Sequence, residues 1–313
     1  MHNFKLQLAV LMAAGSFLAA SSAPAENQSQ EGQERVVVTI LSGNEMPGGI
    51  PQDALHVKVN GKDSNVTGWT QLRSPRSKVE MVVLIDDGAR ASLGTQMSDI
   101  AKFIQGLPPD AKAAVAYMEN GRAAFAGPLT TDHAAAVQEL HLPIPGMPGV
   151  SASPYFCLSD LAKNWPSKDA HARREVVMVT DGVDYYEVRY DPEDPCVEAA
   201  IEDSIRAHLI VYSIYWRNQG FLGRTGYADY DGQNLLALLT EATGGNSYWL
   251  GFGNPVSFEP YLADINRRLD DQYELDFMAP MGSKPQMETL NLKVSAHVKI
   301  DAPQQVYVHP GAE

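Results

Sequence analysis

Cysteine is scarce in this chain, which has Cys157 and Cys196 and no others among its 313 residues. Two cysteines are too few for the disulfide framework of a small secreted domain, and they allow one bond at most. Basic residues are also few, with 24 Lys and Arg against 38 Asp and Glu and a net charge of -14. Because a chain this acidic repels nucleic acid and anionic lipid, neither is expected as a partner.

Several catalytic motifs are missing as well. The sequence has no H-E-x-x-H pattern, no Walker lysine and no G-x-G-x-x-G, and its eight His are scattered. The segment 149–153 approaches a G-x-S-x-G nucleophile elbow but lacks the final Gly. These absences favour a protein that binds a partner over one that catalyses a reaction, and no catalytic residue is assigned.

A long apolar run occurs only near the N-terminus. Lys5 precedes an apolar stretch over 6–20, and the small residues that follow end in A-P-A at 23–25. This order is typical of a secretory signal peptide, and the stretch is shorter than the roughly 20 residues that a membrane span needs. We predict a signal peptide over 1–25 and export to the periplasm or the outside, without a membrane span in the mature chain. An uncleaved anchor is the alternative.

Strand patterns occur toward both ends of the mature chain. A polar, flexible start is expected over 26–34, followed by an N-terminal β segment over 35–77 in which 36–41 is rich in β-branched residues. Apolar and polar residues alternate again over 290–300, within a C-terminal β segment expected over 271–309. Because neither segment is large enough to fold alone, the two are expected to form one small sheet.

Strand and helix patterns alternate over the middle of the chain, 78–270. Continuous apolar runs at 81–85 and 176–179 are typical of strands buried on both faces of a parallel sheet, and a helix pattern follows the first over 93–107. The predicted fold is therefore α/β, a doubly wound and mostly parallel sheet with a small β subdomain. Further strands are expected at 113–118, 122–126, 209–215 and 246–250, and further helices at 131–140, 155–165, 195–207, 234–242 and 256–269.

Acidic residues follow both of the continuous apolar runs. Asp86 and Asp87 come directly after the first, and Asp181 follows the second with Asp184 close behind. In an open α/β sheet, ligands bind outside the carboxyl ends of the strands, so these acids are candidate site residues. The alternative is that they only cap the helices that follow.

These two strands with their acids, in their order and separation, resemble the von Willebrand factor A (VWA) family in its bacterial form. The segment E-A-T-G-G at 241–245 is also similar to that family. The segment Q-Y-E-L-D-F at 272–277 is similar to a strand of a bacterial subgroup with flanking β segments. The resemblance covers 78–280. It implies a Rossmann-like VWA fold and a non-catalytic adhesion module that engages a protein or a surface polymer.

In the VWA family the strand ends form a metal-ion-dependent adhesion site, which binds Mg²⁺ through D-x-S-x-S, a Thr from a later loop and a final Asp. The resemblance matches Asp86 to the first acid and Asp181 to the last. Ser151 or Ser153 could stand for the Thr, and Asp87 could act as a replacement ligand. No cofactor is expected, and Mg²⁺ is the ion that hydroxyl and carboxylate oxygens of this kind could hold.

The two Ser positions of that pattern are not kept. Gly88 stands at the first and has no side-chain oxygen, and Arg90 stands at the second. A guanidinium carries only donors, so Arg90 cannot ligate a metal and could instead occupy the place of the ion between Asp86 and Asp181. The resemblance therefore implies a degenerate adhesion site.

Both cysteines lie in the first turns of predicted helices. In the resembling fold the starts of these two helices lie at the same edge of the sheet, so the resemblance implies a disulfide between Cys157 and Cys196. The alternative is two separate buried thiols.

Aromatic residues gather in the loops after two middle strands. Tyr and Trp in loops can anchor a protein interface, and ordinary loop packing is the alternative. These candidates for partner binding are Tyr185, Tyr186, Tyr190, Trp216, Tyr227 and Tyr230.

Three functions remain open from the sequence. The first is an exported binding module that engages its partner at the strand-end face. The second is a metal-dependent hydrolase, because clustered acids can hold two metal ions. The third is a structural subunit of an envelope assembly that docks through the terminal β segments. The hydrolase would use Asp86, Asp87, Asp181 and Asp184.

Overall fold

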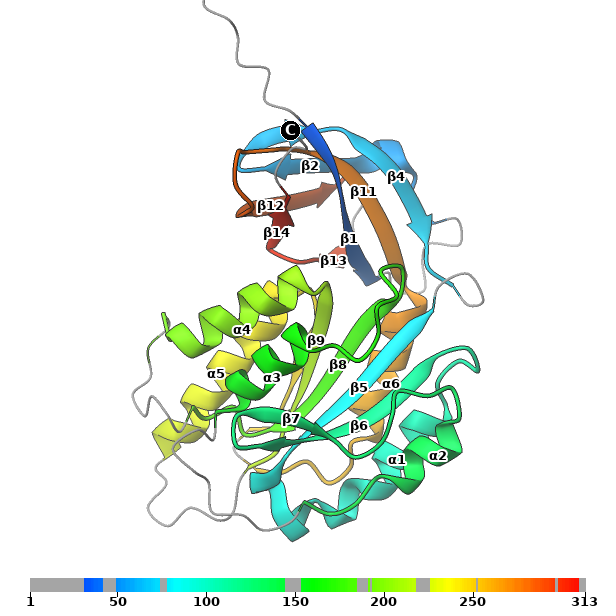
Figure 1. Ribbon diagram of the computed structural model, residues 1–313, viewed down its shortest axis with the longest axis vertical. Helices are drawn as coiled ribbons and strands as arrows, with labels where there is room; N and C mark the ends of the chain where they lie inside the picture. The colour runs from blue at the N-terminus through cyan, green and yellow to red at the C-terminus, as the bar shows by residue number, and fades with distance from the viewer. Residues whose placement is uncertain are drawn as a thin grey trace, which may run out of the picture.

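The computed structural model has two parts (Figure 1). An α/β part contains a six-stranded sheet covered by helices, and a β part above it contains two four-stranded sheets. None of the helices within the described ranges is long and apolar enough to cross a membrane. The residues that the structure describes are 31–41, 49–73, 78–143, 153–184, 191, 193–217, 226–251, 253–295 and 298–309. The expected signal peptide lies outside these ranges.

The six-stranded sheet is doubly wound and mostly parallel, which confirms the predicted fold class. Its order is β10-β9-β8-β5-β6-β7, and β7 at one edge runs antiparallel to its neighbour. The chain begins near the middle with β5, builds one half, and returns to build the other half from β8. The ends of β5 and β8 therefore flank the topological switch point, where such sheets bind ligands. The strands are β5 (Val79–Asp86), β6 (Lys112–Glu119), β7 (Arg122–Phe125), β8 (Arg173–Thr180), β9 (Leu209–Tyr215) and β10 (Ser247–Tyr248).

Helices cover both faces of this sheet (Figure 1). Val83 and Ile85 of β5 pack in a core with α1, α2 and α6, whereas Val82 and Leu84 pack in a second core with α3, α4 and α5. Because β5 is buried on both faces, it needs the continuous apolar run that its sequence shows. The helices are the 3-10 helix η2 (Asp87–Gln96), α1 (Met97–Gln105), α2 (His133–Gln138), α3 (Pro154–Lys163), α4 (Pro195–Arg206), α5 (Gly226–Ala242) and α6 (Glu259–Asp270).

The β part combines segments from both ends of the chain, but in two sheets instead of the single sheet expected. Their orders are β13-β1-β11-β4 and β14-β12-β2-β3. Strand β1 begins at Glu31 and pairs with β11 from its first residue. Residues 31–34, which we expected to be flexible, are therefore part of a strand. The elements are β1 (Glu31–Leu41), the 3-10 helix η1 (Gln52–Ala54), β2 (Leu55–Val59), β3 (Lys62–Ser64), β4 (Val66–Gln71), β11 (Gln272–Pro280), β12 (Gln286–Val294), β13 (Lys299–Asp301) and β14 (Gln305–Val308).

Three predicted elements differ most from those that the structure shows. The helix expected over 93–107 is divided into η2 and α1, because the chain turns directly after β5 and Asp86 caps that turn. Helix α5 begins at Gly226 instead of residue 234. The strand expected over 290–300 is divided between β12 and β13, which belong to different sheets.

A buried polar network joins the central sheet to the β part. The guanidinium of Arg173, at the start of β8, donates to the carbonyl oxygen of Leu269 at 2.8 Å and to the side-chain oxygen of Gln272. Gln272 begins β11 and donates to a carboxylate oxygen of Glu175 at 2.9 Å. Burial raises the pKa of Glu175 to about 7, although the positive charge of Arg173 opposes the shift. The network thus ties β8 to the strand that leads into the β part.

Candidate functional site

Asp86 and Thr180 join the two strands at the switch point. Asp86 ends β5, and its Oδ1 accepts a hydrogen bond from the backbone N–H of Gly88 at 2.8 Å. Its Oδ2 accepts from the hydroxyl of Thr180, the last residue of β8, at 2.5 Å. Both oxygens of Asp86 therefore have a donor within the protein. Sequence reasoning did not single out Thr180, although its place directly before Asp181 puts it at the same edge.

Asp181 lies close enough to Asp86 for the two charges to interact. Its side chain is buried, with 1 % exposed, and its Oδ1 accepts from the backbone N–H of Val183 at 2.9 Å. Burial, and then the negative charge of Asp181, raise the pKa of Asp86 to about 7, with a smaller contribution from Asp87. At neutral pH the edge therefore holds Asp86 partly protonated next to its acidic neighbour.

The titration of Asp86 predicts an unusual pH dependence of stability. Because its pKa in the folded chain lies above the ordinary 3.8, the folded state holds the proton more tightly. The resulting stabilisation is complete below pH 4 and is lost as the pH rises through 7. Asp86→Asn, which keeps a donor and an acceptor in place, should therefore raise the free energy of unfolding at pH 8 by about 2 kcal/mol. Urea unfolding at pH 8 and pH 4 measures the difference.

Asp132→Asn is the matched control for that measurement, because Asp132 also caps a helix and accepts from the backbone N–H of Ala135 in an exposed position. We expect its effect to be small and the same at both pH values. If Asp86→Asn destabilised the chain equally at pH 8 and pH 4, the burial of an ionised Asp86 would be refuted.

The ligand set for Mg²⁺ is incomplete at this edge. Gly88 offers no side-chain oxygen, and its backbone N–H is a donor that already points at Asp86. A hard, octahedral ion needs several oxygen ligands, and both oxygens of Asp86 are already used. Ser153 does present a buried hydroxyl oxygen without a hydrogen-bond partner, but one hydroxyl does not replace three. The residues described here do not fit the adhesion-site ion.

The remaining metal candidates are only partly described. Asp87 begins η2 and is half-buried. Arg90 lies within η2, but its side chain is outside the description, so its predicted place between the two acids stays a prediction. Ser151 lies outside the described residues.

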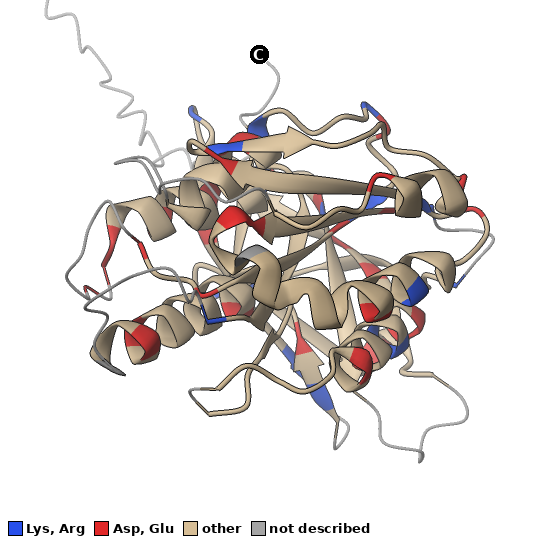
Figure 2. Ribbon diagram, turned by 90° about the horizontal axis from the view of Figure 1, so that it is seen from below, with Lys and Arg blue, Asp and Glu red and all other residues tan. Residues whose placement is uncertain are grey.

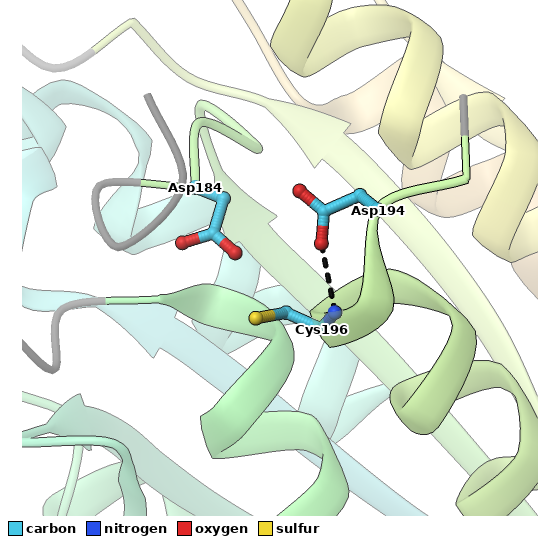
Figure 3. Close-up of side chains that lie close together, drawn as sticks. All are labelled: Asp184, Asp194 and Cys196. Carbon is cyan, nitrogen blue, oxygen red and sulfur yellow. Dashed lines mark hydrogen bonds between the residues drawn. The ribbon is translucent and has the colours of Figure 1, made fainter. Parts of the chain in front are cut away.

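The two cysteines are free in the structure, so the disulfide that we expected between them is not formed. Both are buried in the core under α3 and α4, and burial raises the pKa of each thiol. Such thiols are protonated and unreactive at neutral pH. The thiol of Cys196 lies close to the carboxylates of Asp184 and Asp194 instead of being bonded to Cys157 (Figure 3).

Asp184 and Asp194 lie in a buried acidic region behind the strand ends. Asp194 caps α4, and its Oδ1 accepts from the backbone N–H of Cys196 at 2.8 Å. Tyr155 on α3 donates its hydroxyl to the carbonyl oxygen of Gly182 at 2.7 Å, and burial and these nearby acids raise its pKa. From the sequence we considered Asp194 only as a helix cap. Its separation from Asp184 along the chain did not predict that the two side chains lie close together.

The predicted aromatic anchors fall into three groups. Trp216 is buried, packs edge-on against Phe258 and donates to the hydroxyl of Ser92 at 3.1 Å, so it is a core residue and not an anchor. Tyr227 and Tyr230 are exposed, in the first turns of α5 instead of a loop. The other three, Tyr185, Tyr186 and Tyr190, lie outside the described residues.

Three exposed apolar residues at the same edge were missed. Trp249 and Leu250 follow β10, and Val256 lies between β10 and α6 with 93 % of its surface exposed. The sequence had suggested a strand over 246–250, which would have left Trp249 and Leu250 half-buried. The signal that could have found them is the Gly251 turn, which ends the strand early.

Hydrogen bonds hold this segment against its neighbours. The side-chain N–H of Gln233 on α5 donates to the carbonyl oxygen of Gly251 at 2.7 Å. The backbone N–H of Arg217 donates to Asn254 at 2.6 Å, and Gln96 of η2 donates to the carbonyl oxygen of Val256 at 3.0 Å. These bonds hold Gly251, Asn254 and Val256 to neighbouring parts of the chain, next to the exposed apolar side chains.

The doubly wound fold of the α/β part, with one antiparallel edge strand, rests on the sheet order of this chain itself. No protein-family model and no curated protein matches the chain. Among solved structures, similar ones include the conserved hypothetical protein BatB from Bacteroides thetaiotaomicron (14 % identity, 61 % of this chain and 97 % of that chain, TM-score 0.41). Another is proximal thread matrix protein 1 from the mussel byssus, with a zinc-occupied MIDAS motif (14 % identity, 62 % of this chain and 48 % of that chain, TM-score 0.39). A third is the SpRpn10 VWA domain (13 % identity, 60 % of this chain and 93 % of that chain, TM-score 0.37).

Proposed function

We propose that this chain is an exported, non-catalytic binding module, which engages a protein or a surface polymer at the strand-end face of its VWA-like part. The observation that carries the proposal is a group of exposed apolar side chains at that face. We call this group the strand-end patch. It consists of Tyr227, Tyr230, Trp249, Leu250 and Val256.

All residues of the strand-end patch lie beyond the carboxyl ends of β9 and β10 or at the start of the helix that follows. Apolar residues scattered singly over a surface need no explanation, whereas a group of them at one edge is typical of an interaction site. Among the described residues, the other exposed large apolar side chains are Leu142 and Leu238. The patch therefore contains most of the exposed large apolar side chains in the described ranges.

Charge supports a protein or polymer partner over nucleic acid. In the view from below, Lys and Arg are interspersed with Asp and Glu over the described residues, and no continuous basic band is visible among them (Figure 2). A nucleic-acid partner requires such a band to neutralise its phosphates. The net charge of -14 acts in the same direction.

Affinity capture tests the proposal. The bait is the purified protein, and the prey is an extract of the envelope and secreted fractions of the source cells, quantified by mass spectrometry. Replacing Tyr227, Leu250 and Val256 together by Ser should reduce recovery of the specific partner by about tenfold or more, because apolar anchors dominate binding energy. Leu238→Ser is the control, since Leu238 is also exposed but lies three turns along α5.

The outcomes of the capture separate the alternatives. A partner recovered equally by both variants would refute binding through the strand-end patch. If that partner were instead lost when exposed residues of the β part were changed, the chain would be a structural subunit that docks through its terminal segments. The hydrolase hypothesis requires a metal-loaded sample that is active on phosphoester, peptide or glycoside substrates.

A further inference from the structure

We propose that Asp184, Asp194 and Cys196 form a second, buried site that binds a zinc ion, separate from the strand-end acids matched to the adhesion site. One potential ligand atom from each residue lies within 4.8 Å of the other two. The three side chains are between 1 % and 5 % exposed. The site lies between the end of β8 and the start of α4 (Figure 3).

One oxygen of Asp194 points to a missing partner. Oδ1 of this side chain is used as the cap of α4, where it accepts from the backbone N–H of Cys196 and of Val197. Oδ2 is buried and has no hydrogen-bond partner. In Figure 3 the second carboxylate oxygen of Asp194 lies on the side of this residue that faces Asp184. A buried carboxylate oxygen without a partner is costly, and a cation between the three side chains would remove that cost.

The chemistry of the donor set selects zinc. Zinc takes thiolate, imidazole and carboxylate ligands in a tetrahedral arrangement, often with three from the protein and a fourth from water. Magnesium and calcium prefer oxygen ligands alone, so the thiol of Cys196 disfavours both. Zinc–oxygen and zinc–sulfur bond lengths place tetrahedral ligand atoms about 3.3–3.7 Å apart. Because the three ligand atoms lie within 4.8 Å of one another, they would have to approach by at most about 1.5 Å.

Binding requires the Cys196 thiol to lose its proton, which leaves to solvent as the zinc–sulfur bond forms. Apparent affinity should therefore rise between pH 6 and pH 8. Without an ion, the thiol hydrogen remains shared with the neighbouring carboxylates. That arrangement is the competing explanation of the cluster, and the experiment must distinguish the two.

Cobalt(II) is a suitable probe, because it occupies zinc sites and its bond to a thiolate gives a charge-transfer absorption in the near ultraviolet. Titration of the reduced, purified protein with Co²⁺ should develop this absorption with about one equivalent, and Zn²⁺ should abolish it. Cys196→Ser should lose the absorption. Asp194→Asn, which keeps a helix-capping oxygen, should weaken binding by about tenfold or more.

Cys157→Ser is the matched control, because Cys157 is the other buried thiol in the same core. It should leave the absorption unchanged, as should Asp86→Ala at the strand ends. A wild-type protein that develops no thiolate–cobalt absorption overturns the proposal without the need for any variant. So does an absorption that survives Cys196→Ser or disappears in Cys157→Ser.

Discussion

Replacing Arg173 by Met should lower the free energy of unfolding at pH 8 by about 3–5 kcal/mol, because it removes one partner from a buried charged network. The carbonyl oxygen of Leu269 and the side-chain oxygen of Gln272 would lose their donor. Glu175, which is fully buried, would lose the positive charge that stabilises its ionised form. Urea unfolding of the wild type and the variant measures the change.

The pH dependence identifies the cause. Because the pKa of Glu175 in the folded chain is about 7, its carboxyl is mostly protonated at pH 5 and needs the guanidinium less. The loss caused by Arg173→Met should therefore be clearly smaller at pH 5 than at pH 8. Adding Glu175→Gln should recover part of the loss at pH 8 in a double-mutant cycle. A loss that does not change with pH or with Glu175→Gln would show that packing, and not charge, decides the effect.

Restoring the two missing hydroxyls should create a magnesium site at the strand ends. In the variant Gly88→Ser with Arg90→Ser, two side-chain hydroxyls stand where the wild type has a glycine without a side-chain oxygen and a guanidinium. Affinity for Mg²⁺ should rise by about tenfold or more over the wild type, because each added oxygen ligand and the removed positive charge favour the ion. Calorimetric titration measures the gain.

Asp181→Ala in that double variant is the control, since it removes the final acid and should abolish the gain. Gly88→Ser alone should give a smaller increase, because Arg90 stays in place. An unchanged affinity in the double variant would show that these residues do not occupy the positions that the VWA resemblance assigns to them.

The central sheet could be predicted because its strands are buried on both faces. The apolar runs at 81–85 and 176–179 are typical of strands in a parallel sheet that is covered on both faces, and Leu209–Tyr215 was predicted with its observed bounds. The β part was harder, because β1 pairs with β11 across most of the chain. Local pattern shows that such segments are strands but does not say which strands pair, so two sheets were predicted as one.

At the candidate site, residue type was a poor guide to environment. Trp216 directly follows a strand and was a candidate anchor, with ordinary loop packing as the alternative. Its backbone N–H donates to the carbonyl oxygen of Thr180 and its ring lies in the core, so the alternative holds. Cys196 was matched to Cys157 because both lie at the starts of helices. In the structure the thiol of Cys196 instead lies near Asp184 and Asp194, which belong to the segment between β8 and α4. The surroundings of Trp216 and Cys196 depend on the directions in which their side chains point, and the spacing of residues in a sequence does not predict these directions.

Whether partner binding needs an ion can be measured directly. The strand-end patch is the proposed contact surface, and both carboxylate oxygens of Asp86 already accept hydrogen bonds, from Gly88 and from Thr180. We expect recovery of the partner that depends on the patch to be unchanged when Mg²⁺ is removed with a chelator. A partner that is lost in chelator, and restored by Mg²⁺ but not by Zn²⁺, would contradict this and show that an ion bridges the strand ends to the partner.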